Sequence, residues 1–369
     1  MLEERRGLPA EVSVGIIANP ASGRDIRRLV AGASVFGNAD KGGMVYRLLA
    51  GLGATGVGRA LMMPAADGVS STLRRRVRAR ATENDSGGAA PFPVLEELPM
   101  PLTGTARDSE LAVELLRAKG VAALVVLGGD GTHRVVAKQC GDIPLCALST
   151  GTNNSFPEMR EATVAGLATG LVATGQVGGD GALRRETALA VELEGREREL
   201  ALIEVAVTRD RFTGARALWR GDEVSELFVT FASPSAIGLC SVAGLLRPLA
   251  RGARQGLHVR LAASPADAEL ALRVPLAPGL LVPVGIRGFD LIEMEEPVAV
   301  AAGEGCLALD GERELERRRG EPALVRLVPG PRTIDIDSVM LEAARRGLLD
   351  GERPASGPRL RAQNGHTPE

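Results

Sequence analysis

The sequence predicts an α/β protein with two parts. The first is an N-terminal, three-layer, Rossmann-like domain built on a parallel sheet, and the second is a β-rich, mostly antiparallel C-terminal domain. Two observations carry this prediction. Apolar strand-like segments alternate with helical segments through the first part of the chain. From about residue 185 onward, strand-like segments follow one another, separated by turns that contain Gly, Pro or Asp.

The N-terminal part opens on VSVGIIA (12–18), which is apolar and β-branched, as a strand buried in a parallel sheet should be. A later helix is opened by Thr or Ser capping and closed by Gly120. The expected strands are 12–18, 59–64, 92–98, 121–127 and 143–149. The expected helices are 24–33, 41–53, 67–81, 105–120 and one that begins near Thr132, and residues 83–91 read as a surface loop or linker.

The second part begins with one long expected helix over 157–175. The strands expected after it are 186–195, 198–208, 226–233, 257–263, 269–276, 306–312 and 323–330. A closing helix is expected over 335–349, and the polar, Gly- and Pro-containing residues after it predict a disordered tail.

The length of 369 residues favours two domains or one large one. The division that we expect is an N-terminal extension at 1–11, an α/β nucleotide-binding domain at 12–156, a β-rich domain at 157–333, a C-terminal helix at 334–350 and a disordered tail at 351–369.

The composition excludes several classes of partner. The formal net charge is −2 and aromatic residues make up 2% of the chain, so neither nucleic acid nor an anionic membrane surface is an expected partner. The basic segment LRRRVRAR (73–80) is read as a solvated helix face. Because Lys41, Lys119 and Lys138 are the only lysines, a phosphate clamp would depend on Arg or on backbone N–H groups.

The four cysteines form no CxxC pair, and no His lies at zinc spacing from them, so we expect no zinc site and a reducing compartment. The N-terminus has no apolar core of a secretion signal, and no apolar run approaches the ~18 residues of a membrane span. A cytoplasmic protein is therefore expected.

Three loops rich in Gly, Ser, Thr and Asn follow strands of the expected parallel sheet: NPASG (19–23), GGDGT (128–132) and STGTNNS (149–155). Ligands of such sheets bind beyond the carboxyl ends of the strands, where helix N-termini favour anions. Each loop alone also fits a capped turn. As a set they predict phosphate binding by Asn19, Pro20, Ser22, Gly23, Gly128, Gly129, Gly131, Thr132, Thr150, Gly151, Thr152, Asn153 and Asn154.

Asp130 is the only acid within these loops. It has two interpretations: a catalytic group that takes a proton from an attacking hydroxyl or helps to hold magnesium, or the N-cap of the helix that follows. The neighbouring His133 favours a buried position on the first helical turn over a contact with phosphate.

GLGATG (51–56) matches a dinucleotide-binding fingerprint, but a helix precedes it and a strand follows, the reverse of the order required. We interpret Gly51, Gly53 and Gly56 as a helix stop and turn. The sequence contains no P-loop.

NPASG, GGDGT and TGTNN, in that order, resemble the superfamily of ATP-dependent NAD kinases and their relatives, the diacylglycerol and sphingosine kinases. ASPSAIGLCSVAGLLRP (232–248) and ALDGE (308–312) resemble later elements of the same superfamily. Residues 15–49 and 147–175 resemble one branch more closely, the acetoin-catabolism protein X group.

The resemblance implies a cleft between two domains and a last helix that returns to pack on the first domain. It implies transfer of the γ-phosphoryl group of ATP, with Mg²⁺, to a hydroxyl, by superfamily default the 2′-OH of NAD, in NADP biosynthesis or in acetoin catabolism. It implies that Asp130 is the catalytic base and that the chain self-associates as a dimer or tetramer. On the acceptor side it implies roles for Glu204, Ser233, Ser235 and Asp310.

The chain departs from the NAD kinase pattern on the acceptor side. Ile203 precedes Glu204 where NAD kinases have an Asn-Glu pair, and isoleucine offers no amide hydrogen bonds. The loop TGTNNSF is nearer to the lipid-kinase form, and ASPSAIGL lacks the family's tyrosine. Two alternatives to a small-molecule kinase therefore stay open: a catalytically inactive, nucleotide-binding regulator and a lipid kinase.

Overall fold

The structure is a computed structural model that describes residues 11–20, 34, 36–65, 68–83, 92–179, 181–196, 198–209, 223–301 and 303–350. Four predictions lie outside the described residues: the helix at 24–33, nearly all of the loop at 83–91, the tail at 351–369, and the site residues Ser22 and Gly23.

The first sheet has the strand order β3-β2-β1-β4-β5-β16-β6-β7, and β13 also pairs with β16. The pairs from β3 through β5 to β16 are parallel, whereas β16, β6 and β7 pair antiparallel. The strands are β1 (Ser13–Ala18), β2 (Arg59–Met62), β3 (Val94–Glu97), β4 (Ala123–Gly128), β5 (Leu145–Ser149), β6 (Leu183–Leu193), β7 (Glu199–Ala201), β13 (Pro297–Ala299) and β16 (Ala323–Ile334).

Helices cover both faces of the parallel part, which confirms the predicted three-layer architecture. Val14 and Ile16 of β1 pack in the core that lies under one helical layer, and Ile17 packs in the core of the opposite face. The first layer contains α2 (Asn38–Ala54), α3 (Val69–Glu83), α6 (Ala162–Ala173) and α8 (Ile336–Arg346). The second contains α4 (Ala106–Ala118) and α5 (Asp130–Ala137). Because α8 packs in the first layer, the last helix returns to the N-terminal domain as expected.

The second sheet is antiparallel and has the order β11-β12-β10-β9-β8-β14-β15, as the β-rich prediction required. Its strands are β8 (Glu204–Thr208), β9 (Val224–Val229), β10 (Gln255–Leu261), β11 (Leu270–Ala277), β12 (Leu280–Glu293), β14 (Gly305–Leu309) and β15 (Glu312–Arg317). The helix α7 (Cys240–Leu246) and the 3₁₀ turn η3 (Pro265–Asp267) lie between them along the chain.

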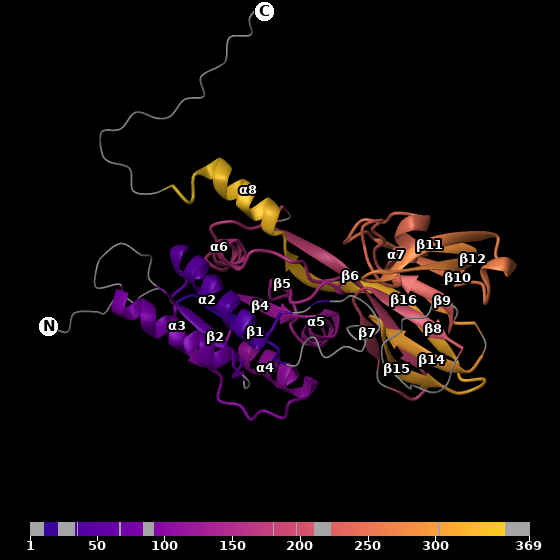
Figure 1. Cartoon of the computed structure of the whole chain (residues 1–369), viewed down its shortest axis with the longest axis horizontal. Helices are drawn as coiled ribbons and strands as arrows, with labels where there is room; N and C mark the ends of the chain where they lie inside the picture. The colour runs from indigo at the N-terminus through magenta and orange to yellow at the C-terminus, as the bar shows by residue number, and fades with distance from the viewer. Residues whose placement is uncertain are drawn as a thin grey trace, which may run out of the picture.

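The long strands β6 and β16 run from the parallel sheet toward the second sheet (Figure 1). Thr333 of β16 pairs with Leu145 of β5, while Leu189 of β6 and Leu327 of β16 share a core with Phe228 of the second sheet. Backbone pairing therefore crosses the predicted boundary at 156/157, and the division into domains stays a prediction.

Two predicted elements need correction. The helix expected from 157 begins at Ala162, because Glu158 instead pairs with the β5 edge: Ser149 N donates to Glu158 O at 2.9 Å. The strand expected over 198–208 is two strands, β7 and β8, because the backbone between them turns its N–H groups toward Asp310. Helix α7 and strands β12 and β15 are additional elements that the pattern did not predict.

The GLGATG segment also needs a partial correction. Gly56, with a φ of 88°, lies in the turn after α2, as predicted. Gly51 lies inside α2 and does not stop it. A Cβ atom at Gly51 would lie 2.4 Å from the carbonyl oxygen of Thr163, so the glycine permits close packing of α2 on α6.

This packing yields a stability prediction. Gly51→Ala should lower the free energy of unfolding by about 1–3 kcal/mol, because the new methyl group meets the α6 backbone, which cannot move aside cheaply. Denaturant unfolding measures the change. Gly43→Ala in the same helix is the matched control, since its Cβ would make only ordinary contact, 3.5 Å from Arg76 Nη1. Equal effects of the two substitutions would contradict this account of Gly51.

Candidate functional site

The corner between β4 and α5 is made of glycines because neighbouring side chains approach it closely. Gly129 is the N-cap of α5 and has extended backbone. A Cβ atom at Gly128 would lie 2.7 Å from Thr132 Cβ, and one at Gly129 would lie 2.9 Å from Asn154 Oδ1. Gly128 therefore makes room for Thr132 in the first turn of α5, and Gly129 makes room for the loop after β5.

The three predicted loops meet at the carboxyl edge of the parallel sheet. Asn19 Nδ2, after β1, donates to Thr132 Oγ1 at 2.9 Å. Thr150 N, after β5, donates to the carbonyl oxygen of Gly128 at 3.3 Å. Pro20 follows Asn19 directly in the first of these loops. The structure therefore brings together the described members of all three loops, as the sequence predicted.

The loop after β5 is held by its own side chains. Ser149 Oγ donates to Gly151 O at 2.7 Å and accepts a hydrogen bond from Asn154 Nδ2 at 2.8 Å. Thr152 exchanges hydrogen bonds with Ser34, since Thr152 N donates to Ser34 O and Ser34 N donates to Thr152 Oγ1, both at 2.9 Å. Asn153, which lies between Thr152 and Asn154 in the sequence, is half-buried.

Asp130 is the first residue of α5 and is half-buried. Its Oδ1 accepts the N–H of Phe156 at 2.9 Å, and both carboxylate oxygens lie 3.1 Å from the N of Ser155. The N-cap interpretation of Asp130 is wrong, because Gly129 occupies that position. The carboxylate instead joins the first turn of α5 to the loop after β5.

The β-rich half reaches the same corner through α7 and the residues before it. Ser155 Oγ donates to Ile237 O at 2.9 Å, and Cys240 Sγ lies 3.3 Å from Ser155 Oγ. Burial raises the pKa of the Cys240 thiol well above its usual value, and the charges of Glu204 and Asp130 raise it further. Cys240 is therefore a neutral packing group at this corner.

A cleft of about 900 Å³ opens between the loop after β5 and two segments of the β-rich half. Ser233 and Ser235, predicted on the acceptor side, line it, with their hydroxyl oxygens 2.8 Å apart. Its lining comes from Ser149, Gly151, Thr152 and residues 154–155 and 157–159 on one side and from residues 231–237 and 248–251 on the other. Asp130, Glu204 and Asp310 do not line this cleft.

Asp310 is a buried residue of the β14–β15 turn, with a φ of 50°. Its carboxylate accepts the backbone N–H groups of Leu202, Ile203 and Glu204 at 2.7–3.2 Å. Burial raises its pKa, while Arg134 and these three N–H groups oppose that shift. The contacts make Asp310 a positioning residue for the start of β8, and its acceptor-side role stays a prediction.

Arg134 joins this turn to the corner. Its Nε lies 3.7 Å from Asp310 Oδ2, and both side chains are at least 95% buried. Arg134 lies on α5 one turn after Asp130, so the ion pair connects that helix with β8 and the buried Glu204.

Two side chains near the corner were not among the predicted site residues. Glu312, at the start of β15, has its Oε1 3.7 Å from the position of a Cβ at Gly131. Lys41 is 1% exposed, and its ammonium donates to the carbonyl oxygen of Asn19 at 3.0 Å. Both carried a sequence signal: Glu312 ends the ALDGE motif, and Lys41 is one of only three lysines.

In the part of the chain that the structure describes, no group of three or more His, Cys, Asp or Glu side chains could hold a metal ion. Over the same residues, no helix is both long and apolar enough to cross a membrane.

Comparison with known proteins matches both parts of the chain. Residues 14–177 match the family model of the ATP-NAD kinase N-terminal domain, and residues 187–330 match that of the acetoin catabolism protein X C-terminal domain. The chain is 43% identical over 350 residues to Acetoin catabolism protein X of Cupriavidus necator, an alignment that covers 93% of this chain and 96% of that protein.

His133, next to the GGDGT motif, yields a prediction on pH. It is fully buried, its Nδ1 donates to Gly129 O at 2.9 Å, and burial lowers its pKa from 6.5 to about 4. In the unfolded chain the imidazole of His133 is protonated near pH 6.5, whereas in the folded chain it stays neutral until about pH 4. The stability from the neutral ring is therefore present above pH 6.5 and is lost as the pH falls toward 4, by roughly 3 kcal/mol.

Denaturant unfolding between pH 7 and pH 4 measures this loss. His133→Gln keeps a neutral donor near Gly129 O but cannot titrate, so its stability should fall less steeply over this range than that of the wild type. Parallel pH profiles for the two proteins would show that His133 is not the group responsible.

Proposed function

Because this chain belongs to the acetoin catabolism protein X family and carries the N-terminal domain of ATP-NAD kinases, we propose that it is an ATP-dependent small-molecule kinase linked to acetoin catabolism. The observation that supports this most is the meeting of three polar, glycine-bearing loops around Asp130 at the carboxyl edge of a parallel sheet. Open α/β sheets bind nucleotides at such an edge.

The corner residues fit a bound triphosphate. Backbone N–H groups at the start of α5 point out of a helix N-terminus, where a phosphate group is favoured by hydrogen bonds and by the helix dipole. Gly128 and Gly129 leave no side chain in the way, and the buried Lys41 adds a positive charge beside Asn19. Asn19 and Thr132, already joined to each other, border the same space.

Glu312, whose carboxylate oxygens lie beside Gly131, would hold Mg²⁺ together with the nucleotide phosphates. When bound, the metal neutralises phosphate charge during transfer. The protein itself contributes to the transfer by positioning the acceptor and by excluding water.

In the proposed reaction, the acceptor hydroxyl oxygen forms a bond to the γ-phosphorus, and the bond from that phosphorus to the ADP oxygen breaks. Asp130 accepts the hydroxyl proton, so the products are ADP and a phosphate monoester. The acceptor is NAD, by analogy with the N-terminal match, or a small hydroxylated metabolite. Self-association remains a prediction in this proposal.

A second candidate function is a nucleotide-binding regulator without catalysis. It is favoured by the contacts of Asp130, since both of its oxygens already lie within hydrogen-bond distance of backbone N–H groups. A carboxylate stabilised in this way is a weaker base. Ile203, in place of the family's asparagine, favours the same alternative.

Asp130→Asn tests the two functions. The variant should bind ATP within a few-fold of the wild type in calorimetry, because asparagine can still accept the N–H groups of residues 155 and 156. Its rate of acceptor-dependent ADP release should fall by about a hundredfold or more, because the amide cannot accept the proton. Asp142→Asn, at an exposed carboxylate paired with Arg185, is the matched control and should keep full activity.

Glu312→Gln completes the test. Full activity in Asp130→Asn together with a large loss in Glu312→Gln would transfer the role of base to Glu312. A wild-type protein that binds ATP but releases no ADP with any acceptor would favour the regulator.

A further inference from the structure

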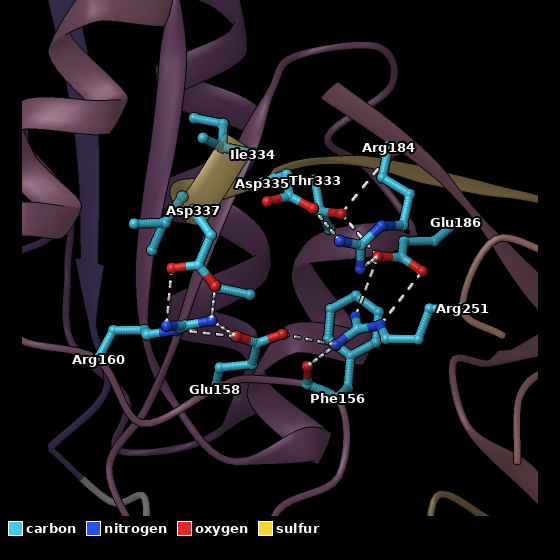
Figure 2. Close-up of a pocket in the computed structure, with 12 residues that line it drawn as sticks. Phe156, Glu158, Arg160, Arg184, Glu186, Arg251, Thr333, Ile334, Asp335 and Asp337 are labelled. Atoms are coloured by element: carbon cyan, nitrogen blue, oxygen red, sulfur yellow. Dashed lines mark hydrogen bonds and ion pairs between the residues drawn. The ribbon is translucent and has the colours of Figure 1, made fainter. Parts of the chain in front are cut away.

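Arg251 lies where two cavities meet. It lines the 900 Å³ cleft described above and also a smaller cavity of about 140 Å³. Figure 2 shows the second cavity, in which the Arg251 side chain lies beside Phe156 and reaches Glu186. Among the described residues that line the larger cleft, it is the only Lys or Arg.

The Arg251 guanidinium is fixed on several sides. Nε and Nη2 face the Glu186 carboxylate at 3.4 and 3.1 Å, and Nη1 donates to the carbonyl oxygen of Phe156 at 2.8 Å. The guanidinium carbon also lies 4.7 Å from the ring centre of Phe156 and 5.2 Å from that of Phe231. A cation held in this way presents its remaining N–H groups in a defined place.

These contacts leave donors for a ligand. A guanidinium has five N–H groups. At most three of those on Arg251 face Glu186 and Phe156, and Glu158 is too distant for a hydrogen bond, with its Oε1 3.7 Å from Nη1. The side chain is 17% exposed. At least two N–H groups of Arg251 therefore make no hydrogen bond to a described residue, although Nη1 also forms an ion pair with Glu158.

The charge of Arg251 is already compensated. The Glu186 side chain is 2% exposed and stays beside the guanidinium, anchored by Thr333 Oγ1, which donates to Glu186 Oε1 at 2.6 Å. The nearby Glu158 adds a second negative charge. A compensated guanidinium donates hydrogen bonds well but gives little net attraction to an anion.

The other residues that line the cleft also favour an uncharged ligand. Its other lining groups are hydroxyls, one amide, the Glu158 carboxylate and apolar side chains that include Ala236, Ile237 and Leu249. NAD carries a pyrophosphate with two negative charges, for which the described lining offers no uncompensated cation. A short ligand with a methyl group and oxygen atoms matches this lining better.

We propose that the acceptor bound in this cleft is a short, uncharged, hydroxylated compound with a second oxygen, and that Arg251 selects it by donating a hydrogen bond to that second oxygen. This inference rests on the proposed function, and it adds the substrate class and a specificity-determining residue. Asp130 does not itself line the cleft, but it binds the N–H of Ser155, which does, and Arg251 holds the carbonyl of Phe156, whose N–H Asp130 also binds.

The test uses the full-length protein and two compounds of similar shape. These are 3-hydroxybutan-2-one, which is neutral, and lactate, in which a carboxylate replaces the acetyl group. Binding is measured by ligand-observed NMR and turnover by coupled ADP release, with NAD as a third probe. We expect the neutral compound to bind about tenfold or more tightly than lactate, and NAD to bind weakly.

Variants assign the effect to Arg251. Arg251→Met should weaken binding of the neutral compound about tenfold and leave ATP affinity unchanged, because a hydrogen bond from a charged donor is lost. Glu186→Gln should strengthen binding of the anion. Because this substitution removes the carboxylate closest to Arg251, the guanidinium should bind lactate about tenfold more tightly than it does in the wild type. Arg247→Met, at an exposed arginine outside the cleft, is the matched control.

Because Arg251→Met leaves the buried Glu186 charge with only the more distant Arg184 as an ionic partner, the double variant Glu186→Gln/Arg251→Met provides a folded reference. Tighter binding of lactate or NAD than of the neutral compound by the wild type would overturn the proposal. So would unchanged affinity in both Arg251 variants, or no binding of the neutral compound. Binding of the neutral compound without ADP release would contradict the kinase proposal alone, and turnover of NAD only would contradict this inference alone.

Discussion

The site depends on one carboxylate that joins two neighbouring corners of a parallel sheet. Asp130 begins α5, and it accepts N–H groups from Ser155 and Phe156 in the loop after β5. Those N–H groups lie in a loop outside regular secondary structure, and without the carboxylate they would need other partners. The same interaction sets the distance between the predicted phosphate loop and the cleft. Asp130 is therefore both the proposed catalytic base and the side chain that positions the loop after β5.

Polar contacts connect the β-rich half to this corner, beside an apolar core that the two halves share. Ser155 bonds to Ile237, Arg251 bonds to Phe156, and Arg134 pairs with Asp310. Each contact leads to a residue next to Asp130 or on the same helix. Such contacts have strict geometry, because a buried polar group that loses its partner costs about 1–3 kcal/mol or more. In the proposed kinase, these contacts would hold the acceptor cleft and the nucleotide loops in a fixed position relative to each other.

The fold class and the loops could be predicted from the sequence because they depend on local patterns. Runs such as VSVGIIA identify buried parallel strands, and glycine-rich corners after them identify the binding edge. The role of Asp130 toward residues 155 and 156 could not be predicted in this way, because it depends on two loops 25 residues apart that meet only in the folded sheet. Arg251 was missed for the same reason: its partners come from β6 and from the loop after β5. The split between β7 and β8 is set by Asp310, more than a hundred residues later in the chain.

The continuous strands β6 and β16 limit how the molecule can move. They pair along most of their length, from Ala323 with Leu193 to Ile334 with Leu183, and the pairing is irregular only between Pro329 and Arg332. Many two-domain kinases close over their substrates by a hinge at a flexible linker. Here a rigid-body rotation of one sheet against the other would have to bend the paired strands β6 and β16. They would bend most easily at the irregular pairing between Pro329 and Arg332. In the proposed kinase, substrate entry and product exit are therefore expected to proceed through rearrangement of the loops at the cleft, with the two sheets keeping their mutual orientation.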